Sequence, residues 1–114
     1  MTTVLQIVES LGPVSVLTLQ GKIDGDTFRG LVERAEKLIE AGRKQLIIDM
    51  AGVSYMSSAG LVALQSIHNK LHAVGGRLAV AALTGDVARV VEMTGPPDWL
   101  NIFPDVAGAK ASFD

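Results

Sequence analysis

Residues 49–61 read DMAGVSYMSSAGL and lie between two segments of different hydrophobic periodicity. The short apolar run at 45–50, just before and into this stretch, is of the kind that sits inside a sheet. From Leu61, apolar residues recur every three or four positions as far as Val74, and a Gly-Gly pair then stops the run. We therefore predict that residues 49–61 join a central strand to an amphipathic helix.

The segments after this helix continue the alternation of strands and helices. A second apolar run at 78–83 predicts another central strand. Beyond it, the pattern indicates a helix at 87–93, a short strand at 101–103 and a last helix after Pro104. The second half of the chain therefore adds two strands and two helices to the central pair.

The segments before the central strand begin with a predicted hairpin. Residues 4–8 and 14–19 are rich in β-branched side chains and partly alternate between apolar and polar. The residues at 10–13 between them include Gly and Pro, which are typical of turns. We therefore expect an antiparallel pair of strands at the start of the chain.

A helix over 27–41 completes the predicted pattern. Its apolar residues stand at helical spacing, either Asp24 or Asp26 can cap its start, and Gly42 closes its end. Strands that alternate with helices imply right-handed crossovers and a largely parallel sheet. We expect an α/β fold in one domain over 1–114, with a mixed, mostly parallel sheet of about five strands, about four helices and an N-terminal hairpin.

Composition excludes several classes of protein. A chain of 114 residues with a net charge of -2 has the length of one domain and lacks the basic stripe that nucleic-acid binding needs. The absence of cysteine excludes disulfides, thiolate metal sites and a cysteine nucleophile. The apolar run at 78–83 is far shorter than the ~20 residues that cross a bilayer. We therefore expect a cytoplasmic protein that binds no nucleic acid and inserts in no membrane.

The residues that could carry catalysis are few. His68 and His72 stand four apart, a spacing at which two imidazoles can share a metal, but the helix offers no Asp, Glu or Cys to complete the site. Two partly exposed polar residues beside the apolar stripe are the simpler interpretation. The glycines match neither phosphate-binding motif, G-x-x-x-x-G-K-S/T or G-x-G-x-x-G. We therefore expect no metal, no cofactor and no enzymatic activity.

The end of the deciding stretch resembles a family signature. Residues 56–61 read MSSAGL. This is similar to the motif of STAS domains, the fold shared by bacterial anti-sigma factor antagonists and the cytoplasmic tails of sulfate transporters. In that motif the strand end is followed by Met-Asp-Ser-Ser/Thr-Gly-Leu, and its first Ser is phosphorylated. Met56, Ser58, Gly60 and Leu61 match, and Ser58 falls on the phosphorylated serine.

The resemblance covers nearly the whole chain. Residues 21–24 read GKID and resemble the family's Gly-x-Leu-Asp before its first helix, while 75–78 and 93–95 resemble later landmarks. Two positions inside the motif differ, because Ser57 stands where the family has Asp, and Ala59 where a second Ser or Thr is common.

A third departure concerns a loop. The Gly-Pro-Pro sequence at 95–97 replaces the family's Gly-Leu-polar sequence, which is expected to reshape a surface loop.

The resemblance implies a regulatory protein of anti-sigma factor antagonist type. Unphosphorylated, it would bind an anti-sigma serine kinase and so free a sigma factor or another client. The kinase would phosphorylate Ser58 with ATP, Ser57 being the less favoured acceptor, and a phosphatase would reset the protein. Apart from the resemblance, we take a monomer as the default expectation. The implied contact residues are Asp24, Ser57, Ser58, Ala59, Gly60 and Leu61.

Physical arguments for the same residues give a second interpretation of several of them. A phosphate at the first turn of a helix lies beside unpaired backbone N–H groups and the positive end of the helix dipole, so the fold tolerates it. Ser57 and Ser58 can equally be an ordinary N-cap and first-turn pair. Asp24 can be a cap residue, and Gly60 can permit a close approach of the helix to a strand.

Two other functions are compatible with the sequence. The chain could be a constitutive scaffold, or a transporter-associated STAS subunit, in which Ser58 is never modified and a fixed interface does the work. It could also be a sensor that binds a nucleotide or another small ligand, in which case added nucleotide would raise its thermal stability.

Overall fold

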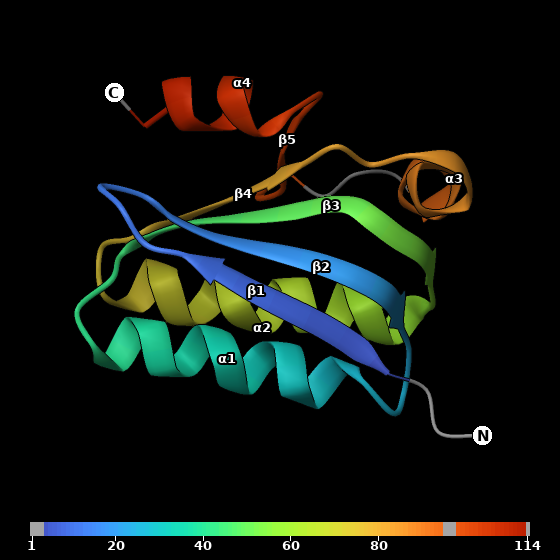
Figure 1. Ribbon diagram of the computed structural model, residues 1–114, viewed down its shortest axis with the longest axis horizontal. Helices are drawn as coiled ribbons and strands as arrows, with labels where there is room; N and C mark the ends of the chain where they lie inside the picture. Colours follow the sequence, from blue (N-terminus) through green and yellow to red (C-terminus); the bar gives the residue numbers. More distant parts are fainter. Residues whose placement is uncertain (1–3, 95–97, 114) are drawn as a thin grey trace.

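Five strands form one sheet in the spatial order β1-β2-β3-β4-β5, as the computed structural model of residues 4–94 and 98–113 shows (Figure 1). The elements are β1 (Leu5–Ser10), β2 (Ser15–Ile23), α1 (Phe28–Glu40), β3 (Gln45–Met56), α2 (Ser58–Ala73), β4 (Arg77–Ala81), α3 (Gly85–Thr94), β5 (Asn101–Phe103) and α4 (Val106–Ala111). β1 pairs with β2 in antiparallel fashion and every other neighbouring pair is parallel. The predicted α/β fold with its N-terminal hairpin is therefore confirmed.

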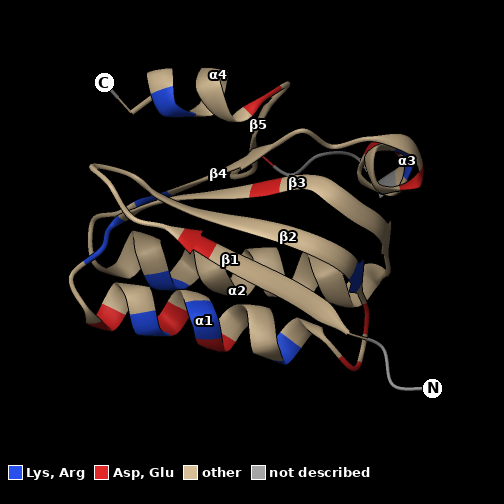
Figure 2. Cartoon of the chain, viewed as in Figure 1, with Lys and Arg blue, Asp and Glu red and all other residues tan. Residues whose placement is uncertain are grey.

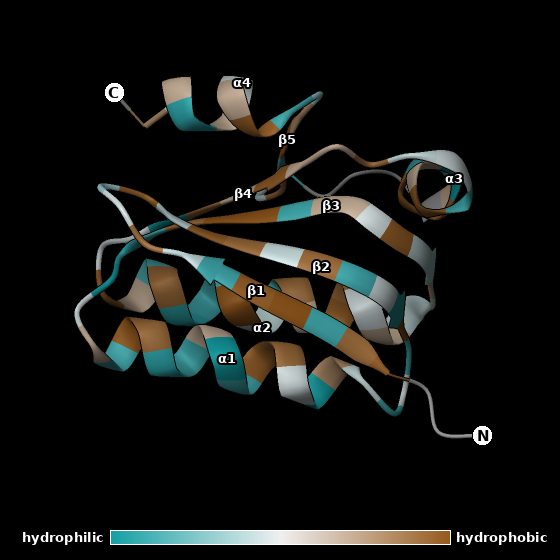
Figure 3. Ribbon diagram, viewed as in Figure 1, coloured by the Kyte–Doolittle hydropathy of each residue, from teal (hydrophilic) through white to brown (hydrophobic). Residues whose placement is uncertain are grey.

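The main core lies between the sheet and the pair α1 and α2, which cover one face side by side (Figure 1). Leu17 and Leu19 of β2, Ile48 of β3 and Leu64 and Ile67 of α2 are completely or almost completely buried there. Figure 3 shows the same division, since the strands are largely hydrophobic and the helices are hydrophobic in part. Burial of this apolar surface is the main stabilising contribution to the fold.

The second face of the sheet carries a smaller core. Its buried members are Val16, Ile47, Ala79, Ala81 and Ala109, and α4 is the helix that packs on them (Figure 1). Arg77 of β4 holds the end of this layer, because its guanidinium donates to the Ser112 carbonyl at 2.9 Å and to the Ser112 hydroxyl at 2.7 Å. The same guanidinium lies 4.5 Å from the centroid of the Phe113 ring.

The two long helices end in the same way, as the glycines after them predict. Gly42 and Gly75 have φ values of +90° and +77°, which a residue with a Cβ adopts only at a cost. In each case the next N–H reaches back to the helix, from Arg43 to Leu38 at 2.9 Å and from Gly76 to Leu71 at 2.7 Å. This is the Schellman motif, and it satisfies carbonyls that the helix end leaves without a partner.

The structure differs from the prediction mainly at the carboxyl ends of β2 and β3. β3 continues to Met56 rather than ending at residue 50, and β2 continues to Ile23. Beyond Asp49 only β2 still pairs with β3, and the register of this pair shifts between Thr18 and Gln20 and again between Gly21 and Lys22. This part of β3 therefore has one neighbouring strand instead of two. An extension with one neighbour does not need the apolar run by which we recognised the strand. The expected loop change at 95–97 lies outside the described residues.

Candidate functional site

The signature residues lie where β2 and β3 end together. Ile23 pairs with Met56, and the Ser57 N–H donates to the Ile23 carbonyl at 2.9 Å. This hydrogen bond places the start of α2 against the turn that leads from β2 into α1. Residues 24 and 57–61, which are distant in the sequence, therefore meet at one end of the sheet.

Ser57 and Ser58 occupy different environments although they are neighbours. Ser57 is the N-cap residue of α2, is half-buried, and its hydroxyl oxygen accepts a hydrogen bond from the Ala59 N–H at 3.3 Å. Ser58 is the first residue of the helix and is exposed. Its hydroxyl makes no hydrogen bond with any residue in the part of the chain that the structure describes. The interpretation of Ser57 as a cap is confirmed, and Ser58 is left accessible.

Gly60 is buried directly behind the two serines. A Cβ at this position would overlap the Met56 side chain and would lie 3.2 Å from Cγ2 of Ile23. The first turn of α2 can therefore approach the ends of β2 and β3 only because residue 60 has no side chain. The packing role expected for Gly60 is confirmed.

Asp24 organises the turn before α1. The prediction that Asp24 or Asp26 caps this helix is wrong, because neither is its N-cap residue. Its carboxylate accepts from the N–H groups of Asp26 at 2.9 Å and Thr27 at 3.2 Å. The N-cap residue is Thr27, whose hydroxyl donates to the Lys22 carbonyl at 2.8 Å and makes no capping bond to the helix. Asp24 therefore stabilises an Asx-type turn, because its side chain binds the backbone two and three residues further on.

The six predicted contact residues are gathered at one place but are unequally exposed. Ser58 is exposed, while Asp24, Ser57, Ala59 and Leu61 are half-buried and Gly60 is buried. Leu61 packs against the main core. A partner that docks here would therefore meet Ser58 first.

Comparison with known proteins identifies the family. The sequence profile of the STAS domain matches residues 6–109. This chain belongs to the STAS domain family.

Other STAS proteins resemble this one over most of their length. The putative anti-sigma factor antagonist BtrV of Bordetella bronchiseptica is 27% identical over 97 residues, which cover 85% of this chain and 81% of BtrV. An anti-sigma factor antagonist from Mycobacterium paratuberculosis has a crystal structure with a TM-score of 0.85 and 24% identity, covering 96% of this chain and 93% of that one. The phosphorylated form of the Bacillus cell fate determinant SpoIIAA has a TM-score of 0.71 and 19% identity, covering 97% of this chain and 100% of that one. The structural likenesses show that this STAS domain has the fold of anti-sigma factor antagonists.

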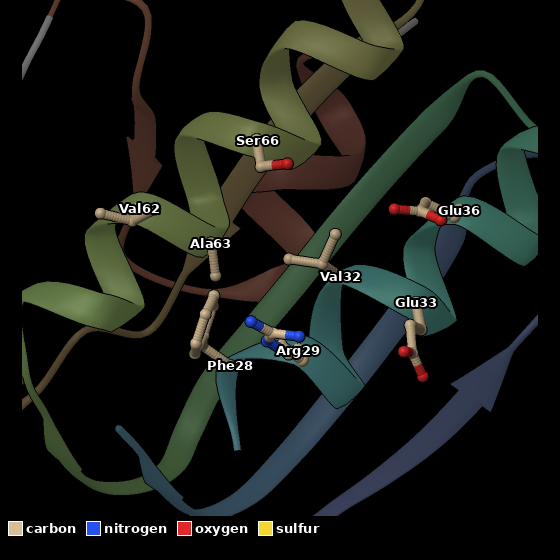
Figure 4. A pocket seen from close by; sticks show the side chains of 8 residues that line it. All are labelled: Phe28, Arg29, Val32, Glu33, Glu36, Val62, Ala63 and Ser66. Atoms are coloured by element: carbon tan, nitrogen blue, oxygen red, sulfur yellow. The ribbon is translucent and has the colours of Figure 1, made fainter. Parts of the chain in front are cut away.

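A groove between α1 and α2 lies next to the signature in this STAS domain (Figure 4). It encloses about 320 Å³, and its apolar wall includes Phe28, Val32 and Val62. Val62 is 55% exposed although it belongs to an apolar stretch of α2. Sequence reasoning missed the groove, because Val62 was not part of the predicted apolar stripe and its neighbours come from another helix.

The two histidines of this STAS domain form a stack and no metal site. The ring centroids of His68 and His72 are 5.8 Å apart, and His68 also stacks on Trp99 at 5.0 Å. Among the described residues, no group of three or more His, Asp or Glu side chains is arranged to hold a metal. Over the same residues, no helix is both long and apolar enough to cross a membrane.

Proposed function

We propose that this STAS domain is an anti-sigma factor antagonist switched by phosphorylation of Ser58. In its unphosphorylated form it binds an anti-sigma serine kinase in the cytoplasm through the start of α2 and the turn at Asp24, and this frees the kinase's client. The phosphorylated form dissociates, and a phosphatase restores the hydroxyl. The chain itself catalyses nothing, because the ATP and the catalytic groups belong to the kinase.

The observation that carries this proposal is the accessible hydroxyl of Ser58 at the first position of α2. A phosphoryl acceptor must reach into the active site of another protein, and Ser58 is exposed whereas the Ser57 hydroxyl oxygen is engaged by the Ala59 N–H. In the transfer, the Ser58 oxygen forms a bond to the γ-phosphorus of ATP and the bond to the β-phosphate oxygen breaks. ADP leaves, and a base of the kinase takes the hydroxyl proton.

Electrostatics explains why the modification would end binding without unfolding the domain. A phosphate on Ser58 would lie at the N-terminus of a 16-residue helix, where the dipole favours negative charge. The group adds roughly -1.5 to -2 charges, which a partner covering Ser58 would have to desolvate. Since about 1.4 kcal/mol changes affinity tenfold, a desolvation cost of several kcal/mol is enough to separate the complex.

The likeness to related proteins supports the proposal. BtrV and the Mycobacterium paratuberculosis protein are described as anti-sigma factor antagonists, and SpoIIAA is known in a phosphorylated form. The residues proposed to take part in this chain are Asp24 and residues 57–61, of which Ser58, Gly60 and Leu61 match the family's motif.

The first test is mass spectrometry of the protein purified from its own host, with wild type compared with Ser58→Ala and Ser57→Ala. We expect one phosphoryl group that maps to Ser58 and disappears only in Ser58→Ala. Binding of the wild type to the host's anti-sigma kinase should be lost when Ser58 is phosphorylated. An unmodified Ser58 under all growth conditions, together with a partner that co-purifies at fixed stoichiometry, would overturn the switch.

A second function is favoured by one departure from the family. Ser57 occupies the position of the family's Asp, and Ser57 is not acidic. If phosphoryl transfer needs that acidic side chain, the domain acts as a constitutive scaffold or as a subunit associated with a transporter. A stoichiometric complex that is indifferent to ATP would identify this function.

A further inference from the structure

The groove between α1 and α2 continues from the surface around Ser58. Val62 stands four residues after Ser58 on α2, so the two side chains lie on the same side of the helix one turn apart. Phe28, the first residue of α1, lies on the opposite wall (Figure 4). A protein large enough to cover the Ser58 hydroxyl would therefore extend over this end of the groove.

The floor and walls of the groove suit an aliphatic side chain. Ala63 of α2 is buried and points toward Phe28, which is half-buried like Val32 of α1, and Val62 stands at the outer edge of the groove (Figure 4). Burial of one more aliphatic side chain here is worth ~1.5 to 3 kcal/mol. The groove is open to solvent at its rim, where Ser66 and the charged residues of α1 stand.

Charge is distributed unequally along the rim. Arg29 is exposed near the Ser58 end, with its guanidinium 5.9 Å from the centroid of the Phe28 ring. Glu33 and Glu36 follow one and two turns further along α1, and Glu36 is paired with Lys70 at 3.4 Å. Within residues 4–94 and 98–113, neither Arg29 nor Glu33 takes part in an ion pair. Figure 2 shows this run of charged residues along α1.

We propose that this groove is a second contact surface for the kinase, separate from the phosphorylated residue. It takes an aliphatic side chain of the kinase that is flanked by an acidic group facing Arg29 and a basic group facing Glu33. This inference rests on the proposed function, since it extends the same complex along α2. The groove supplies affinity and orientation, whereas Ser58 supplies the switch.

If the groove supplies affinity and Ser58 supplies the switch, substitutions at the two sites should have different kinetic effects. A substitution in the groove weakens docking and raises the KM for this chain as a kinase substrate, but leaves kcat unchanged. A substitution of Ser58 removes the acceptor and abolishes phosphorylation. The two kinds of variant therefore separate docking from chemistry.

The test uses the full chain and the purified anti-sigma serine kinase of the same host, in the presence of ADP for binding and ATP for phosphorylation. Val62→Lys is compared with Val74→Lys, which makes the same change at an exposed valine at the other end of α2. We expect Val62→Lys to raise Kd and KM at least tenfold, with kcat within twofold of wild type. Val74→Lys should leave Kd and KM within twofold of their wild-type values.

The charged rim is tested in the same assays with a matched pair on α1. Arg29→Glu should weaken binding several-fold, while Lys37→Glu changes charge equally on the same helix outside the groove and should not. Circular dichroism of all four variants checks that each is folded. If the kinase neither binds nor phosphorylates wild type, the proposed function fails and the groove fails with it. If wild type is bound and phosphorylated and Val62→Lys behaves as Val74→Lys does, the groove proposal alone is wrong.

Discussion

The two ends of α2 are fixed to the sheet by different means. At its C-terminal end, Gly75 and Gly76 close a Schellman motif, and a Cβ on Gly76 would overlap the backbone carbonyl of Lys44. At its N-terminal end, the Ser57 hydroxyl makes one capping bond of 3.3 Å, and the atoms that Gly60 avoids belong to side chains. The N-terminal end also has the backbone hydrogen bond from Ser57 to Ile23, but only at the C-terminal end is the glycine packed against backbone atoms, which cannot turn aside as a side chain can. The lesson is that the rigid end maintains the fold and leaves the opposite end able to carry an exposed, modifiable Ser58.

The largest expected effect is at the rigid end. Gly76→Ala should lower the free energy of unfolding by about 3 kcal/mol, because neither the Lys44 backbone nor the start of β4 can move aside. Urea denaturation monitored by circular dichroism measures this. Gly30→Ala is the control, since residue 30 lies inside α1 with no atom near a new Cβ, and we expect a gain of up to ~1 kcal/mol. Equal stability of Gly76→Ala and wild type would remove the contrast between the two ends.

Gly60→Ala should cost less, about 2 kcal/mol, because the Met56 side chain can turn away at the price of a poorer rotamer. Met56→Ala makes room but leaves a cavity of its own. The double variant should therefore be more stable than the sum of the two single changes predicts, which the same denaturation series will measure as a coupling energy. If the two effects are additive, the Met56 side chain is not the group that a Cβ at residue 60 would overlap.

Ser57→Ala should lower stability by about 1 kcal/mol, the usual value for loss of an N-cap side chain. Ser57→Asp restores the family's acidic residue and keeps a cap that also suits the helix dipole, so its melting temperature should equal or slightly exceed that of wild type. A clear loss of stability in Ser57→Asp would show that the half-buried site does not accept a carboxylate.

Ser58→Ala should change the free energy of unfolding least, by less than ~0.5 kcal/mol, because the side chain is exposed and makes no hydrogen bond among the described residues. The same variant should bind the kinase permanently, since ATP can no longer release it. Calorimetric unfolding and a binding assay with and without ATP measure the two quantities. A large loss of stability in Ser58→Ala would assign the residue a structural role.

Much of the fold could be predicted from local patterns. The apolar spacing from Leu61 to Leu71 identified α2, and the glycines at 42, 75 and 76 marked helix ends that the structure confirms. These signals can be recognised in the sequence because each depends on a few neighbouring residues. The extension of β3 from Ala51 to Met56 depends instead on which strand runs beside it, and no local pattern reports that.

The candidate site, like the fold, could be predicted where it depends on neighbouring residues. The cap at Ser57 and the close approach at Gly60 follow from residue type and position at a helix start, and both were anticipated. The predicted helix cap at Asp24 or Asp26 was wrong, because Thr27 is the N-cap residue and the Asp24 carboxylate accepts from the Asp26 and Thr27 N–H groups instead. The groove could not be foreseen, since it forms only where side chains of two helices, among them Phe28 and Val62, line one space.

The contacts of Arg77 with Ser112 and Phe113 have a practical consequence for fusion proteins made from this chain. These contacts keep the end of the chain after α4 beside the beginnings of β3 and β4, where Arg77 pairs with Gln45. Ser58 lies at the opposite end of the sheet, where β2 and β3 finish (Figure 1). The first strand starts with Leu5 opposite Gly21, toward the Ser58 end. A fluorescent protein or affinity tag fused behind Phe113 therefore sits remote from the serine, whereas one fused ahead of Leu5 crowds it.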